Sequence, residues 1–270
     1  MSRGSLRSGR SIASRATPDP PEPSGGRLGP YLKRLREGYG YTLRKVEERA
    51  QALGESIDNS QLSRFEKGKA VPSFEKLRAL ARIFNVPVQN FSDVFDLEEF
   101  EPFKPETGTY EDLLRDGRSW FERGEYGRAF VTYERALERA EEGADPSDAA
   151  ERAAGARWRM ATALKALGNL AMAEHELRQI LRHRARLTKP TRMRTLLQLA
   201  YLYRERGDLL LASVLARECL ELARSIGDDE TAAGVWNTLG NIAHDEHRHD
   251  EAMAAYGEAL AILELSGQSH

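Results

Sequence analysis

Small residues recur at long, regular intervals through the second half of this chain. Gly117, Ala161, Ala200 and Gly240 are separated by 44, 39 and 40 residues, and the apolar residues around them follow three- and four-residue steps. Such steps are typical of amphipathic helices, and no strand signal interrupts them. One helical unit of this kind cannot bury its apolar face alone, so repeated units stack. The repeat predicts that residues 109–270 form an α-solenoid of about four helical hairpins.

The last repeat carries the clearest pattern, in the segment WNTLGNIAHDEHRHDEAMAAYGEAL. The positions that define it are Trp236, Leu239, Gly240, Ala252, Tyr256 and Ala259. The pattern resembles the tetratricopeptide repeat (TPR), in which small residues let paired helices approach and large residues fill the gaps. The intervals exceed the roughly 34 residues of a standard TPR unit, so we expect longer helices or connections.

The N-terminal part is organised differently. Residues 1–27 are mostly Ser, Arg, Gly and Pro, and are predicted to be a disordered basic tail. Its arginines at positions 3, 7, 10 and 15 could enter a DNA minor groove as a flexible arm, but an unfolded tail is favoured. Residues 93–108, which include EPFKPETG, are predicted to be a connecting helix and a linker.

Residues 28–92 show the periodicity of five short helices. Thr42, Asp58 and Ser73 stand where N-caps would begin the second, third and fourth helices, and Asp58 with Gln61 has the spacing of a capping box. The fourth helix is expected to bury one stripe, formed by Phe74, Leu77, Leu80, Ala81 and Phe84.

Charge is divided unevenly along the chain. The net charge is +3 for residues 1–28, +5 for residues 29–92 and −10 for residues 93–270. A basic N-terminal part on an acidic body indicates a polyanionic partner for the N-terminal part only.

Composition disfavours several other classes. The chain is 40% hydrophobic and 30% charged, and no apolar run approaches the roughly 20 residues that span a bilayer, so no membrane partner is expected. The N-terminus lacks the apolar segment of a secretory signal, which favours a cytoplasmic, nucleoid-associated protein. The single cysteine, Cys219, excludes an internal disulfide and is predicted to be a small core residue.

Four motifs in residues 28–92 resemble the lambda-repressor-like, Cro-type (XRE) helix-turn-helix family: LKRLRE, TLRKVEE, LSRFEKGKAVPS and FEKLRALARIFNV. The resemblance implies a five-helix DNA-binding domain whose third helix enters the major groove of double-stranded DNA. We expect the protein to bind as a homodimer on a palindromic operator. By position, the base-reading residues would be Asn59, Ser60, Gln61 and Arg64. Their chemistry agrees, because Asn or Gln can pair with adenine and Arg with guanine.

The same resemblance implies contacts with the DNA backbone. These would come from Thr42, Arg44 and Lys45 at the exposed start of the second helix and from Lys67 and Lys69 after the third. Amides and cations at such positions can meet phosphate, which orients a domain without choosing a sequence.

Two features depart from the family pattern. The segment GESID, residues 54–58, is about five residues longer than the usual turn, so the second helix could run on or the turn could bulge. Leu43 stands where many relatives carry a polar residue next to the bases. The angle at which the third helix enters the groove therefore stays open.

Each base-reading assignment has a structural alternative. Gln61 could serve only the capping box. Arg64 could form a surface ion pair with Glu66 or Glu47. The first two residues of the third helix, Asn59 and Ser60, could simply be first-turn residues.

The TPR frame predicts which side chains line the concave face, which is formed by the first helix of each repeat. Ligand binding is expected of Arg118, Trp158, Lys165, Tyr201, Arg204, Asn237, Asn241 and His244, with Phe121, Thr162 and Leu197 beside them. Asn237 and Asn241 lie four residues apart on one helical face, where side-chain amides could grip an extended peptide. They could equally be ordinary exposed polar residues.

Metal and catalytic sites are disfavoured. The cluster HDEHRHD offers nitrogen and oxygen donors but no fixed ligand frame, so a solvated turn is favoured over a metal site. No phosphate-binding glycine loop or self-cleavage signature stands out, so we expect neither a cofactor nor an enzymatic activity.

The order of the two parts resembles peptide-sensing regulators of bacteria, in which an XRE-type reader precedes TPRs that bind a signal peptide and often form the dimer. The leading hypothesis is a sequence-specific transcription regulator whose solenoid dimerises or binds a peptide or protein that controls DNA binding. The alternative is a scaffold or adaptor, in which the solenoid recruits a protein and the helix-turn-helix is a nonspecific DNA anchor or a protein contact.

Overall fold

The computed structural model describes residues 26–140, 142 and 145–267. The chain divides into two compact units, and the boundary falls between Asn85 and Val86. Every regular element among the described residues is a helix, which confirms the all-α class. The predicted basic tail lies outside the described residues, apart from Gly26 and Arg27.

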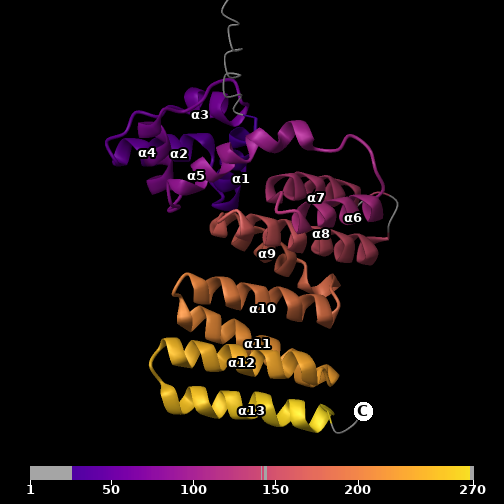
Figure 1. The fold of residues 1–270 in the computed structure, drawn as a ribbon. Coiled ribbons are helices and arrows are strands. Elements are labelled where there is room, and N and C mark those ends of the chain that lie inside the picture. Colours follow the sequence, from indigo (N-terminus) through magenta and orange to yellow (C-terminus); the bar gives the residue numbers. More distant parts are fainter. Residues whose placement is uncertain (1–25, 141, 143–144, 268–270) are drawn as a thin grey trace, which may run out of the picture. The chain divides into compact units, whose positions relative to one another are not determined.

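Four helices form the described part of the first unit (Figure 1): α1 (Leu28–Gly38), α2 (Leu43–Ala52), α3 (Asn59–Glu66) and α4 (Phe74–Ile83). Helix α3 packs against α1 and α2, and α2 also packs against α4. The side chains at these contacts include Leu32, Val46, Leu62, Leu80 and Phe84, which are all 0–1% exposed. Burial of this apolar set fixes α3 on the other helices.

The predicted N-caps are confirmed. Thr42 Oγ1, Asp58 Oδ1 and Ser73 Oγ each accept a hydrogen bond from the amide three residues further on, at 3.1, 2.7 and 3.4 Å. Each bond satisfies a first-turn N–H that has no partner inside its own helix. Local sequence therefore determines where α2, α3 and α4 begin.

The long connection before α3 is a turn and not a continuation of α2. Helix α2 ends at Ala52, and Gly54 adopts a left-handed φ of +74°, which glycine accepts without strain. Ile57 is only 2% exposed and anchors the connection in the core.

One predicted core residue is wrong. Phe74 is expected on the buried stripe of α4, but its side chain is 68% exposed, whereas Leu77 is 8% exposed and Leu80 is fully buried. Phe74 is the first residue of α4. A helical side chain leans toward the N-terminus of its helix, so this ring extends past the end of the packed face.

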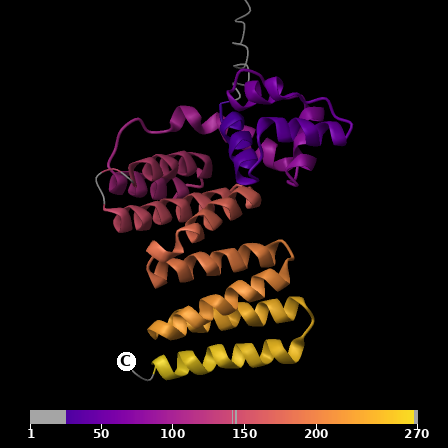
Figure 2. The same cartoon turned by 180° about the vertical axis from the view of Figure 1, so that it is seen from behind.

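The second unit begins with α5 (Gln89–Asp96) and the short 3₁₀ helix η1 (Glu98–Phe103). Four helical hairpins follow (Figures 1 and 2): α6 (Tyr110–Glu122) with α7 (Tyr126–Ala140), α8 (Pro146–Ala166) with α9 (Leu170–Arg182), α10 (Lys189–Glu205) with α11 (Leu209–Ile226), and α12 (Asp229–Asp245) with α13 (His249–Gly267). A second 3₁₀ helix, η2 (Arg184–Arg186), connects α9 to α10. From α6 to α13, each helix packs against its neighbours along the chain, so the predicted four-hairpin solenoid is confirmed.

The long repeat intervals come partly from long helices. Helix α8 has 21 residues and α11 has 18. These helices and the connection that holds η2, between α9 and α10, contribute to the spacing above the roughly 34 residues of a standard TPR.

The recurring small residues mark close contacts within hairpins. A Cβ added at Gly117 would lie 2.4 Å from the Tyr133 ring, and one added at Gly240 would lie 2.4 Å from the Tyr256 ring. The first and last hairpins therefore share the same glycine–tyrosine contact, which any larger residue would block.

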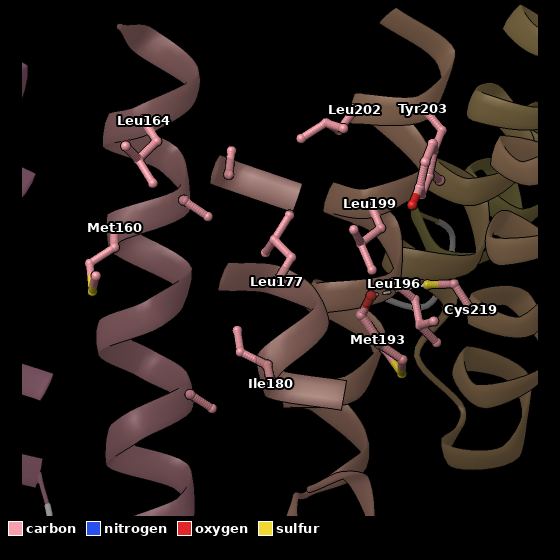
Figure 3. Close-up of a cluster of buried hydrophobic side chains, with 14 of the residues drawn as sticks. Met160, Leu164, Leu177, Ile180, Met193, Leu196, Leu199, Leu202, Tyr203 and Cys219 are labelled. Atoms are coloured by element: carbon pink, nitrogen blue, oxygen red, sulfur yellow. Dashed lines mark hydrogen bonds between the residues drawn. The ribbon is translucent and has the colours of Figure 1, made fainter. Parts of the chain in front are cut away.

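A continuous core joins the hairpins (Figure 3). Leu164 of α8, Leu177 and Ile180 of α9, Leu199 of α10 and Cys219 of α11 belong to one buried cluster. Cys219 is fully buried, which confirms it as a core residue. Stacking between repeats thus buries the apolar faces that no hairpin could bury alone.

The proline-rich stretch after α5 is held against α7. A Cβ added at Gly127 would lie 2.3 Å from the Phe100 ring, so Phe100 packs directly on that glycine. The Arg128 guanidinium lies 4.1 Å from the centroid of the Phe103 ring, and Lys104 Nζ lies 2.9 and 2.7 Å from two carboxylates of α7. We call residues 98–106 the strap.

Candidate nucleic-acid interface and solenoid face

Helix α3 has a buried side and an exposed side. Leu62 and Phe65 are 1% and 6% exposed and hold the helix on its neighbours. Asn59, Ser60 and Arg64 are exposed. Three of the four predicted base-reading residues therefore lie on the solvent side of a helix fixed from behind.

A bidentate ion pair ties the end of α3 to α1. Arg36 Nε donates to Glu66 Oε1 at 2.6 Å, and a second guanidinium nitrogen donates to Glu66 Oε2 at 2.9 Å. Arg36 also donates to the Tyr41 carbonyl at 3.0 Å. The two charged side chains are only 13% and 8% exposed, and hydrogen bonding to Glu66 raises the pKa of Arg36. Fork-to-carboxylate pairing of this kind fixes orientation as well as distance.

This pair decides one of the alternatives for Arg64. Both carboxylate oxygens of Glu66 are engaged by Arg36. Among the described residues, no carboxylate lies within 4.0 Å of the Arg64 guanidinium. The Arg64 side chain is therefore free to bind an external acceptor.

Close backbone approach supports the same arrangement. A Cβ added at Gly29 would lie 2.6 Å from the Glu66 carbonyl oxygen and 2.8 Å from that of Phe65. Only glycine lets the first turn of α1 lie this close to the last turn of α3.

Gln61 differs from the other three predicted readers. Its side chain is half-buried, and its Oε1 accepts a hydrogen bond from Lys76 Nζ at 2.9 Å. Because an ammonium group can only donate, this bond determines which end of the Gln61 amide carries the oxygen. The amide NH₂ has both of its donors available, and Oε1 has one lone pair left for a second donor.

The residues predicted to contact the DNA backbone lie at the start of α2 and directly after α3. Arg44 and Lys45 are exposed and lie 3.6 and 3.2 Å from Glu48, a surface pairing that contributes little. Lys67 and Lys69 follow α3 directly and are exposed, and among the described residues no carboxylate lies within 4.0 Å of either.

Several residues that shape this surface escape sequence analysis. Arg36 and Glu66 are 30 residues apart, and Gln61 and Lys76 are 15 apart, so no helical spacing signals either pair. The exposed Phe74 ring has no signal either, because its neighbours in the apolar pattern are buried.

In the solenoid, the predicted ligand-binding cations connect successive first helices. Lys165 of α8 lies 2.8 Å from Glu205 of α10. Arg204 of α10 lies 2.6 Å from Asp245 of α12 and lowers the pKa of that carboxyl. These contacts place α8, α10 and α12 in one layer, and a ligand carboxylate would have to compete with those of the protein.

Aromatic residues extend this layer. The Arg194 guanidinium lies 5.2 Å from the Trp158 ring centroid, and Tyr201 Oη lies 3.5 Å from Thr238 Oγ1. Arg118, on α6, forms an exposed pair with Glu122 of the same helix at 2.8 Å.

The two asparagines of the predicted peptide site lie on α12. Asn237 is exposed, and Asn241 Oδ1 accepts a hydrogen bond from Tyr256 Oη at 2.9 Å. That bond directs the two N–H donors of Asn241 away from Tyr256. The contact with Tyr256 thus orients Asn241 and leaves the exposed Asn237 side chain free.

Histidines cluster beside this pair. The His249 ring centroid lies 5.7 Å from that of His244 and 6.2 Å from that of His247. Within the described ranges, no group of three or more His, Cys, Asp or Glu side chains has a metal-binding arrangement. None of the described helices is long and apolar enough to cross a lipid bilayer.

Comparison with family models assigns both parts of the chain. Residues 32–91 match the helix-turn-helix family model, and residues 191–265 match the tetratricopeptide repeat model. The chain thus has an XRE-type helix-turn-helix domain followed by TPRs. The hairpins α6 to α9 lie outside the repeat match, although α6 and α7 share the glycine–tyrosine contact of α12 and α13.

Comparison with solved structures finds similar helical proteins. BtubC (BKLC) from P. vanneervenii is 17% identical over 92% of this chain and 91% of that chain, with a TM-score of 0.51. PlcR from Bacillus thuringiensis, solved with the peptide PapR7 and DNA, is 15% identical over 89% of this chain and 95% of that chain, with a TM-score of 0.43. The pheromone receptor Rgg2 from Streptococcus dysgalactiae is 14% identical over 90% and 94%, with a TM-score of 0.26. The likeness to BtubC concerns the fold alone. No curated protein matches the chain.

Proposed function

We propose that this protein is a bacterial, sequence-specific transcription regulator that binds double-stranded DNA through α3. The TPR part would dimerise or bind a peptide or protein, and this event would control DNA binding. The protein would act in the cytoplasm, at the nucleoid, as a homodimer on a palindromic operator. Its role would be regulatory and not enzymatic.

The exposed side of α3 is the observation that carries this proposal. Arg64 has no competing carboxylate among the described residues, because Arg36 occupies Glu66. Asn59 and Ser60 are exposed one turn before it, and Lys67 and Lys69 follow with positive charge. Helix-turn-helix domains place a helix of this composition in the major groove, where Arg recognises guanine and Asn recognises adenine.

The test is a selection from random duplexes followed by fluorescence titration on the selected site. We expect Asn59→Ala or Arg64→Ala to cost about 1–3 kcal/mol on that site and to relax the choice at one base pair. Lys67→Ala or Lys69→Ala should weaken binding to all duplexes alike and reduce the salt slope by about 0.9 each.

The control is Arg82→Ala, which removes an exposed cation near the C-terminal end of α4. The Arg82 guanidinium lies 3.6 Å from the Glu55 carboxylate. This variant should leave both affinity and base choice unchanged. Equal losses on selected and random DNA after Arg64→Ala would contradict base reading. A wild-type protein with no preference among duplexes would favour the adaptor function.

The ligand-binding part of the proposal rests on the face of α8, α10 and α12. Asn237 is exposed and Asn241 has free N–H donors, which suits the backbone of an extended peptide. Arrays of short peptides would identify ligands, and Asn237→Ala should abolish their binding without changing Tm. Sedimentation with and without ligand would then show whether occupation changes the oligomeric state. Peptide binding that survives both Asn237→Ala and Asn241→Ala would place the ligand elsewhere.

A further inference from the structure

The acidic solenoid contains one strongly basic stretch. Residues 177–203 include seven Arg and Lys residues and no Asp or Glu. Residues 93–270 as a whole carry a net charge of −10. Like charges so close together repel one another, so the stretch is suited to an anionic partner.

Five of these cations surround the connection between α9 and α10. Arg182 ends α9, Arg184 and Arg186 are in η2, and Lys189 and Arg192 are in the first turn of α10. We call these five residues the basic turn. Arg192 is half-buried, and the other four are exposed.

The basic turn is not neutralised by the protein. Across the described part of the chain, no carboxylate lies within 4.0 Å of any of the five cations. Arg182 donates to Gln179 Oε1 at 3.3 Å, and Lys189 donates to Ser225 Oγ at 3.1 Å. Both partners are uncharged.

One carboxylate contacts this connection, and it is held by uncharged donors. Glu151 of α8 accepts hydrogen bonds from the Thr188 amide at 2.5 Å and from Thr191 Oγ1 at 2.6 Å. Most other arginines and lysines of this unit have a carboxylate within 4.0 Å, for example Arg157 with Glu176 and Arg204 with Asp245; among the described residues, Arg123, Arg159, Arg194 and Arg217 do not. The basic turn therefore differs from the ion-paired surface around it.

The surface chemistry identifies the kind of anion. No large apolar side chain in residues 177–203 is strongly exposed, and Leu187 and Met193 are 9% and 3% exposed. Protein interfaces have an apolar or aromatic centre, which this surface lacks. A phosphate backbone requires only cations and polar donors, and the guanidinium fork matches phosphate geometry.

We infer that the basic turn binds the phosphate backbone of double-stranded DNA, as a contact separate from α3. At an operator, this contact rests on the proposed function and adds affinity without adding base choice. On DNA of random sequence it acts without α3 reading any base, because phosphate binding is independent of sequence.

The test compares two triple variants with the same change in net charge. One is Arg184→Ala, Arg186→Ala and Arg192→Ala in the basic turn. The matched control is Arg115→Ala, Arg123→Ala and Arg217→Ala, which removes exposed arginines of α6, of its C-cap and of α11. Each full-length variant is titrated with a random 60-base-pair duplex at several salt concentrations.

The expected result follows from counterion release. Three lost phosphate contacts reduce the log–log salt slope by about 2.7, so the affinity deficit at 50 mM salt is about 40-fold larger than at 200 mM. The control variant keeps the wild-type slope. Equal slopes for the two triple variants would overturn the inference. So would a loss of the dimer in sedimentation with an unchanged slope, because the basic turn would then bind the acidic surface of a second copy.

Failure of the basic-turn inference can be distinguished from failure of the proposed function. The ratio of affinities for selected and random duplexes tests α3, and it should be the same in wild type and in the basic-turn variant. A wild-type ratio of one would refute the proposed function, while the slope on random DNA would still decide the role of the basic turn.

Discussion

The Arg36–Glu66 pair should control the stability of α3, and Glu66→Gln is the change that tests it. The substitution keeps the shape of the side chain and removes its charge. The Arg36 guanidinium then stays in a site where it is only 13% exposed, with one neutral partner in place of a carboxylate. Removing one partner of a buried pair costs about 3–5 kcal/mol.

The lower end of that range applies here. Arg36 keeps its hydrogen bond to the Tyr41 carbonyl at 3.0 Å and lies 3.5 Å from Glu37. We therefore expect a loss of about 3 kcal/mol, equivalent to an opening constant raised by about 100-fold.

Hydrogen exchange with mass spectrometry measures this locally. All three tryptophans, Trp120, Trp158 and Trp236, are in the second unit, so intrinsic tryptophan fluorescence cannot report on α3. Peptides that cover α3 should lose protection by about that factor, while peptides from α10 and α12 should be unchanged.

The double variant Arg36→Met with Glu66→Leu is the matched control. Replacing both charges removes the uncompensated cation and should recover most of the protection, since an apolar pair can substitute for a buried ion pair. The reasoning is refuted if Glu66→Gln leaves α3 protected, or if the double variant is no better than the single one.

Three further predictions concern the second unit. Gly240→Ala places a Cβ 2.4 Å from the Tyr256 ring and should lower the free energy of unfolding by about 1–3 kcal/mol, measured by urea unfolding with tryptophan fluorescence. The control Gly234→Ala, on the same helix, meets no atom within 4 Å and should be neutral or slightly stabilising, so equal losses for the two variants would contradict this packing. Burial raises the pKa of the Cys219 thiol to about 12, so the native state holds the neutral thiol and loses stability as pH rises from the unfolded pKa near 9 toward 12. A disulfide reagent at pH 8 should therefore react with Cys219 only as the solenoid unfolds, and rapid reaction of the native protein would contradict the burial of this thiol. Lys104→Met removes the cation between two carboxylates of α7 and should speed cleavage of the strap by a glutamate-specific protease. An unchanged rate would mean that the contacts of Phe100 and Phe103 hold the strap without Lys104.

Local physics made much of the fold predictable. The N-caps at Thr42, Asp58 and Ser73 and the small residues at Gly117 and Gly240 act over one helical turn or one hairpin, and short-range patterns report such features directly. The all-α class and the four-hairpin solenoid followed from these signals.

Contacts between distant residues were not predictable in the same way. Nothing in the sequence pairs Arg36 with Glu66, because the pairing depends on how α1 packs against α3. The hold of the strap on α7 also depends on tertiary packing, and two prolines alone indicate only a break in helical structure. Phe74 was misplaced because an apolar pattern cannot tell where the packed face of a helix ends.

Methylation interference tests the central claim about α3 most directly. A guanine methylated at N7 can no longer accept a hydrogen bond from arginine in the major groove. On the selected site, wild-type protein should be blocked by methylation of one particular guanine in each half-site, and Arg64→Ala should be insensitive to methylation at that guanine. Identical interference patterns for the two proteins would show that Arg64 reads no base.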